Sequence, residues 1–175
     1  MLKYILALLV LITFPLAAEN INSVSQEITH IMPDAMLAGK GRLSFLTWDV
    51  YDAFLYAPKG KYVQGKPIAL SLHYLCDIKG KEIAEKTIEE MRSQGFKDEV
   101  TLAAWHEKMR HIFPNVAVDT RLTGIYTAKG ETLFFKDGMQ IGSFQDPEFG
   151  RYFFNIWLGN KSIHPELRRQ LLGIR

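Results

Sequence analysis

Two arginines lie at positions where their side chains could bind an anion. Arg42 follows a Gly-Lys-Gly turn at the start of an expected strand, and Arg121 begins another strand after Asp119. An arginine at a strand end inside an apolar cleft can fix a carboxylate with two parallel hydrogen bonds. The alternative that the sequence leaves open is a surface arginine paired with a nearby acid such as Asp119.

Aromatic side chains are abundant near these arginines. They are Tyr51, Tyr56, Tyr74, Trp105, Phe153 and Trp157. Large aromatic residues form a core more often than the wall of a ligand cleft, so packing is their first interpretation. Tyr51 and Tyr74 are also the phenols that would donate a proton if the chain were an enzyme.

The common catalytic and metal-binding motifs are missing. The chain has no nucleophile elbow, zinc-protease motif, cysteine pair or Walker loop. His106 and His111 are five residues apart, which places them on different faces of a helix with no acid to complete a metal site. His73, on a strand, is interpreted as a solvated or hydrogen-bonded histidine. We therefore expect neither a metal nor a cofactor.

Residues 1–18 have the layout of a cleavable signal peptide. Lys3 precedes an apolar stretch from Tyr4 to Phe14, a turn follows at Pro15, and small residues end at Ala18. The apolar stretch has about eleven residues, fewer than the roughly twenty that a membrane-spanning helix needs. We expect export, to a periplasm, and a soluble domain over residues 19–175 with no membrane span.

The chain after the signal has the size of one domain. About 155 residues suffice for a single core. Removing Lys3 changes the formal charge from +2 to +1, and the basic residues are scattered, which excludes the concentrated basic face of a nucleic-acid-binding protein. Cys76 is the only cysteine, so no internal disulfide forms. We expect a monomer.

The spacing of apolar residues predicts an α+β fold. β-Branched and aromatic residues predict strands over 42–48 and 50–56, strict alternation predicts one over 67–76, and turn signals separate three more over 122–127, 132–136 and 139–144. Helical spacing and caps predict helices over 81–94, from 98 to before Pro114, over 146–159 and from 165, while 21–32 is either a short helix or a lead-in. Strands, paired helices, a meander and helices in this order predict a large antiparallel sheet covered on one face by helices.

Four segments carry a family resemblance. They are Gly41-Arg42 through Val50-Tyr51-Asp52-Ala53, the stretch from Asp77 to Lys86, the hairpins around Phe134-Phe135 and Gly138, and the stretch from Phe153 to Gly159. Together they resemble the chalcone isomerase-like proteins of bacteria over nearly the whole chain after the signal. The resemblance implies an open-faced β-sandwich, with a ligand cleft between a large antiparallel sheet and a layer of helices.

The resemblance also implies that the family's catalytic groups are mostly missing. Plant members that close a ring in chalcones use an arginine, a threonine, a tyrosine and an asparagine. The tyrosine position is Ile83 here and the asparagine position is Glu90; the threonine falls on Leu46, beside Thr47, and only Arg42 remains, one place out of register. A placed proton donor contributes about 10²–10⁴ in rate, which isoleucine cannot supply. Chalcone isomerisation is therefore not expected.

Three functions remain open from the sequence. The first is a non-catalytic binding module for a small amphipathic anion such as a fatty acid. The second is an isomerase or intramolecular lyase acting on an enone, in which Arg42 stabilises an enolate and Tyr51 or Tyr74 donates a proton. The third is a partner-binding scaffold whose cleft is filled by its own side chains. The expected ligand-binding residues are Arg42, Thr47, Tyr51, Tyr74, Ile83 and Arg121.

Overall fold

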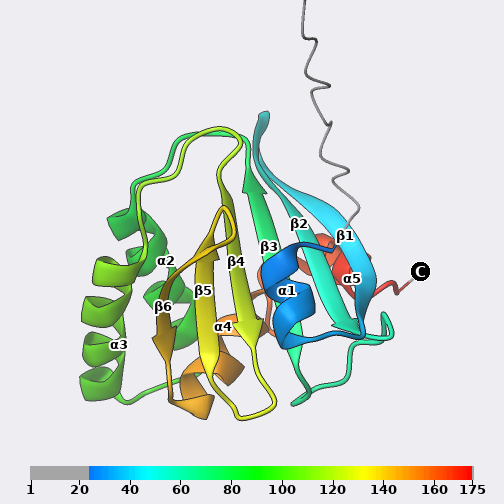
Figure 1. Ribbon diagram of the computed structural model, residues 1–175. Coiled ribbons are helices and arrows are strands. Elements are labelled where there is room, and N and C mark those ends of the chain that lie inside the picture. The colour runs from blue at the N-terminus through cyan, green and yellow to red at the C-terminus, as the bar shows by residue number, and fades with distance from the viewer. Residues whose placement is uncertain (1–23, 175) are drawn as a thin grey trace, which may run out of the picture.

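A six-stranded antiparallel sheet forms the centre of the protein. The structure is a computed structural model that describes residues 24–174; the predicted signal peptide and the predicted domain start at residue 19 lie outside the described residues. The strands lie in chain order, and each pairs with the next (Figure 1). They are β1 (Ala35–Phe45), β2 (Trp48–Pro58), β3 (Ile68–Tyr74), β4 (Arg121–Tyr126), β5 (Thr132–Lys136) and β6 (Met139–Phe144). The predicted antiparallel sheet and meander are confirmed.

Four of the helices in the described chain lie on one face of the sheet, and a short one lies on the other (Figure 1). The first group is α2 (Gly80–Ser93), α3 (Glu99–Ile112), α4 (Pro147–Leu158) and α5 (Pro165–Leu171). The short helix is α1 (Gln26–Ile31), so residues 26–31 of the segment that the sequence left as helix or lead-in form a helix. Between residues 24 and 174, no helix is long and apolar enough to cross a bilayer.

Local sequence signals begin and end the helices as predicted. Asp98 caps α3 by accepting hydrogen bonds from the backbone N–H groups of Val100 and Thr101. Asp146 caps α4, where Pro147 occupies the first turn. Asp146 also accepts a hydrogen bond from Trp105 Nε1 at 3.2 Å, so this cap joins α3 to the start of α4.

The predicted Gly-Lys-Gly turn before Arg42 is wrong. Gly39 and Gly41 lie within β1, which begins at Ala35. A Cβ atom at Gly39 would overlap the carbonyl oxygen of Leu171, and one at Gly41 would meet the side chain of Gln170. The two glycines therefore allow α5 to approach β1 closely, a role that only the packing of distant segments reveals.

Apolar side chains form a core on each face of the sheet. The larger core lies under α2 to α5 and is rich in aromatic rings; Phe144 and Phe149 stack with their centroids 3.6 Å apart. The smaller core joins Ile28 of α1 to Phe54 and Ile125 on the opposite face. The α+β fold with a helical layer on the sheet is thus confirmed, and α1 adds a partial cover that the sequence did not predict.

Candidate functional site

An apolar cavity of about 350 Å³ lies between the sheet and the helical layer, within the size range of small-molecule sites. Its lining includes Leu43, Val50, Leu70, Leu72, Ile78, Phe113, Leu122, Phe134, Phe153 and Ile156. Ile83 of α2 lies on its helical side. The space between Ile83 and the sheet is therefore open, whereas a scaffold filled by its own side chains would have a closed core here.

Two buried phenols contribute polar groups to this cavity. Tyr51 of β2 and Tyr74 of β3 are register partners, and their rings meet edge to face at 5.7 Å. Trp157 Nε1 donates a hydrogen bond to the Tyr51 hydroxyl at 2.9 Å. Within residues 24–174, the Tyr74 hydroxyl has no hydrogen-bond partner. The inner wall thus offers a hydrogen-bond donor that no other described side chain uses.

Burial keeps both phenols protonated. It raises the pKa of Tyr51, and the nearby charge of Glu90 raises it further against the opposing effect of the Trp157 hydrogen bond. Burial likewise raises the pKa of Tyr74, with smaller contributions from Tyr51 and Cys76. At neutral pH the two groups can donate hydrogen bonds but cannot act as bases.

Charged and titratable groups gather at one part of the lining. Lys86 Nζ lies 3.3 Å from Glu89 Oε2 and 3.5 Å from Glu90 Oε1. The Lys86 side chain is 62% exposed, whereas that of Glu90 is 8% exposed, so Lys86 marks where the cavity meets solvent. Among the cavity-lining residues of the described chain, Lys86 is the one lysine or arginine. An anion held in this cavity would share this cation with Glu89 and Glu90.

The protonation states of Lys86 and His164 differ at neutral pH. Burial lowers the pKa of Lys86, but its contacts with Glu89 and Glu90 outweigh this effect and raise the pKa overall. Burial lowers the pKa of His164, and the charge of Lys86 adds to this against the opposing charge of Glu90. Lys86 is therefore a cation while His164 is mostly neutral.

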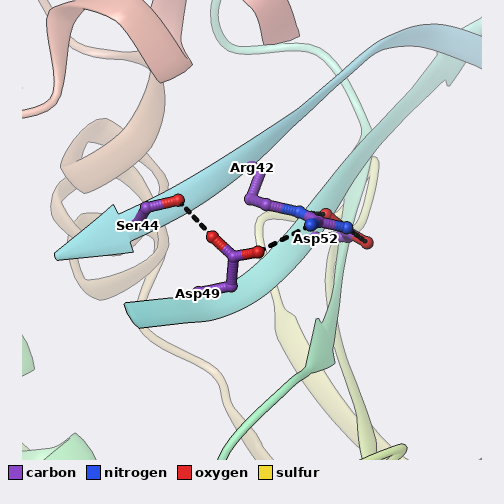
Figure 2. Close-up of polar contacts among 4 residues, drawn as sticks. All are labelled: Arg42, Ser44, Asp49 and Asp52. Carbon is purple, nitrogen blue, oxygen red and sulfur yellow. Dashed lines mark hydrogen bonds and ion pairs between the residues drawn. The ribbon is translucent and has the colours of Figure 1, made fainter. Parts of the chain in front are cut away.

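Arg42 does not line the cavity, contrary to the sequence prediction. It lies opposite Asp52 in the pairing of β1 with β2, whereas the neighbouring pair Leu43 and Tyr51 lines the cavity. Successive strand residues point to opposite faces, so Arg42 faces away. Its guanidinium donates to Asp52 at 2.6 and 2.8 Å and to Asp49 at 2.7 Å, as Figure 2 shows.

This position of Arg42 favours the alternative of a surface arginine paired with acids. Its partners are Asp52 and Asp49 instead of Asp119. The hydrogen bonds and charges of Asp52, followed by those of Asp49, raise the pKa of Arg42 above its ordinary value. The sheet separates Arg42 from the two cavity phenols, so the enolate site of the enzyme hypothesis is not assembled.

Thr47 and Arg121 also lie outside the cavity lining. Thr47 is exposed in the turn between β1 and β2. Arg121 precedes the cavity residue Leu122 on β4 and therefore points to the opposite face. Its backbone N–H donates to Asp137 Oδ1 at 2.8 Å, which ties the start of β4 to the following hairpin. The cavity brings together Tyr51, Tyr74 and Ile83 of the six predicted residues; whether they bind a ligand stays a prediction.

Lys86, the cation of the site, was not among the residues predicted from the sequence. Lys86 lies three residues after Ile83 and four before Glu90, a spacing that places all three along one side of a helix. That pattern could have identified Lys86 once Ile83 was expected in the cleft. His164 lies in the segment before α5, and no local pattern connects it with α2.

The profile of one protein family matches most of the chain. The family is described as chalcone isomerase-like, and the match covers residues 23–173. The chain belongs to the chalcone isomerase-like family. No curated protein sequence matches it significantly.

A solved structure with this fold supports the architecture. It is the crystal structure of a fatty-acid binding protein of Arabidopsis thaliana, with a TM-score of 0.61 and 14% sequence identity. The alignment covers 79% of this chain and 87% of the plant protein. At this identity the likeness shows a shared fold.

Two residues of the cavity lining, Ile83 and Glu90, bear on the question of catalysis. Ile83 and Glu90, which resemblance places at the tyrosine and asparagine positions of catalytic members, both line the cavity. An aliphatic side chain and a buried acid therefore line the helical wall, and their correspondence to the catalytic phenol and amide stays a prediction from the resemblance.

Proposed function

We propose that the protein binds a small amphipathic anion such as a fatty acid in this cavity and does not transform it. The observation that carries the proposal is the apolar cavity whose edge holds a single lysine, Lys86, among its described lining residues. An apolar chain fits the interior and a carboxylate fits the exposed lysine. The name of the plant structural relative, a fatty-acid binding protein, supports the same class of ligand.

The apolar chain of the ligand dominates the free energy of binding. Burying about ten methylenes yields on the order of 8 kcal/mol at roughly 0.8 kcal/mol each. A hydrogen bond between charged groups adds about 1.5–3 kcal/mol when it is shielded, and less at an exposed lysine. The cavity therefore supplies affinity, whereas Lys86 orients the ligand with its carboxylate at the edge.

The absence of catalysis is supported by the chemistry of the wall. Ile83 cannot donate a proton, and Glu90 places a carboxylate where a developing anion needs a donor. The proposal includes export to a periplasm, which the signal-peptide layout of residues 1–18 supports.

Calorimetry with delipidated protein tests the proposal. We expect affinity for saturated fatty acids to increase with chain length until about ten methylenes are buried. Ile83→Trp fills the cavity and lowers the affinity at least tenfold. The matched control is Glu85→Trp, which adds the same ring to an exposed position of α2 outside the lining and leaves affinity unchanged.

Two results would contradict the proposal. One is the absence of binding to every fatty acid of the series. The other is turnover of an enone that is lost in Tyr74→Phe, because this result would assign the cavity to an isomerase or intramolecular lyase of altered mechanism.

A further inference from the structure

The tip of the β1–β2 hairpin exposes three large apolar side chains. Phe45, Leu46 and Trp48 are 69%, 86% and 73% exposed, respectively. Leu46 lies in the turn with a φ of 55°, a region where a bulky residue is disfavoured and where hairpins usually carry asparagine or glycine. Neither the turn geometry nor solubility in water favours leucine at this position.

Polar side-chain contacts hold β1 and β2 together just below these apolar residues. In Figure 1 the hairpin rises beyond the end of β3. On the face away from the cavity, Arg42 joins Asp52 and Asp49, and Ser44 donates to Asp49 at 2.6 Å (Figure 2). These contacts cross from β1 to β2 directly below the tip, so they fix the two strands together where the apolar residues begin.

The apolar tip continues the wall of the cavity. Leu43 lines the cavity, and Phe45 is two residues further along the same strand, so both lie on the same face. Val50 lines the cavity as well. Trp48 precedes Val50 by two residues and is the register partner of Phe45. An apolar surface therefore runs from the ligand site to the exposed end of the hairpin.

We propose that the tip of this hairpin inserts into the interface of a lipid bilayer and places the cavity against the membrane surface. Tryptophan, phenylalanine and leucine are the residues that enter this interface favourably. A fatty acid partitions into membranes, so docking gives the cavity access to its ligand. The purpose of the docking rests on the proposed function, whereas the docking itself is tested without any ligand.

Area and charge favour a lipid surface over a protein partner. Three large side chains expose on the order of 500 Å², whereas each partner in a stable protein complex buries about 800 Å². Arg42, Asp49 and Asp52 together carry a charge of +1 − 2 = −1, so the tip has no excess positive charge to require anionic lipid. We expect binding to zwitterionic vesicles with little dependence on salt.

Tryptophan fluorescence with phosphatidylcholine vesicles provides the test. Trp105 and Trp157 are 5% and 8% exposed, so a blue shift on adding vesicles, and quenching by brominated acyl chains, report Trp48. The double variant Phe45→Ser/Leu46→Ser lowers partitioning more than tenfold. Val100→Ser/Met139→Ser removes exposed apolar side chains elsewhere and leaves partitioning unchanged. All variants share one N-terminus, so the apolar segment 4–14 contributes equally, and an unchanged Tm shows that each variant is folded.

Several outcomes overturn the docking proposal. They are no blue shift with zwitterionic vesicles, equal partitioning of the Phe45→Ser/Leu46→Ser variant and the wild type, and a requirement for anionic lipid that salt abolishes. Self-association that depends on Phe45 and Leu46 without vesicle binding would assign the tip to a second copy of the chain. Fatty-acid affinity measured in solution separates the two proposals. If the protein binds vesicles but no fatty acid, the docking proposal stands and the fatty-acid-binding proposal is rejected.

Discussion

The two faces of the sheet differ in how tightly they are packed. One face lies under α2 to α5, and the other carries α1. The first holds a cavity of about 350 Å³ whose wall includes the buried phenol of Tyr74. On the second, Ile28 of α1 closes a small core with Phe54 and Ile125. An apolar void without a guest costs stability, so the cavity under α2 to α5 favours a site for a guest on that face.

The second face carries its charges in a row beyond α1. Arg42 pairs in register with Asp52, Asp52 with His73, and His73 with Arg121, across four neighbouring strands. Cross-strand neighbours of this kind stabilise a sheet where it faces solvent. The same strands therefore present apolar residues to the cavity and ionic residues to the opposite face, which is why the predicted anion-binding arginines lie on the wrong face for the cavity.

The largest expected effect compares truncations of the two cores. Ile125→Ala opens a new cavity in the closed core under α1 and lowers the free energy of unfolding by about 3–5 kcal/mol. Leu70→Ala only enlarges an existing cavity, so we expect a smaller loss of about 2–3 kcal/mol. Urea denaturation measures both. An equal or larger loss in Leu70→Ala would show that the wall of the cavity is packed as tightly as the closed core.

The next prediction compares Lys86 at the cavity with Arg42 on the opposite face of the sheet. Lys86→Met keeps the apolar stem of the side chain and lowers fatty-acid affinity about three- to tenfold, because the carboxylate loses its partner. Arg42→Met leaves the affinity unchanged, because its guanidinium lies across the sheet. Titration with the methyl ester is the control, since a neutral head group should bind both variants and the wild type alike. A larger loss in Arg42→Met would place the anion on the opposite face.

The third comparison concerns the loss of stability in alkali. The unfolded phenols ionise near pH 10.0, whereas burial raises the pKa of the folded Tyr74 and Tyr51. The folded state then binds more protons, so the free energy of unfolding falls above pH 10, by up to about 1.4 kcal/mol per pH unit for each phenol. Denaturation curves at several pH values measure this slope, and Tyr74→Phe makes it shallower.

Tyr56, on the opposite face, provides the comparison for the alkaline prediction. Its pKa is also raised by burial, but the charge of Arg121 opposes the shift. Tyr56→Phe should therefore change the slope less than Tyr74→Phe does. The reverse order would show that the cavity phenol is already solvated in the folded protein.

The sequence by itself determined the elements and their order. Asp98 and Asp146 cap the helices that they were predicted to cap, and β5 and β6 have the predicted bounds, because caps, turns and apolar spacing act over a few residues. Ile83 was placed in the cleft through the family resemblance, whereas Tyr51 and Tyr74 were predicted as ligand-binding residues of the same cleft; all three line the cavity.

Only the tertiary structure decided which face of each strand met the helices. Alternation along β1 is local, but whether Arg42 or Leu43 points to the cavity depends on how α2, α4 and α5 pack on the sheet. The same packing brings Lys86 and His164 together and makes Gly39 a point of close approach to α5. These relations join residues far apart in the chain, so their energies are absent from any short stretch of sequence.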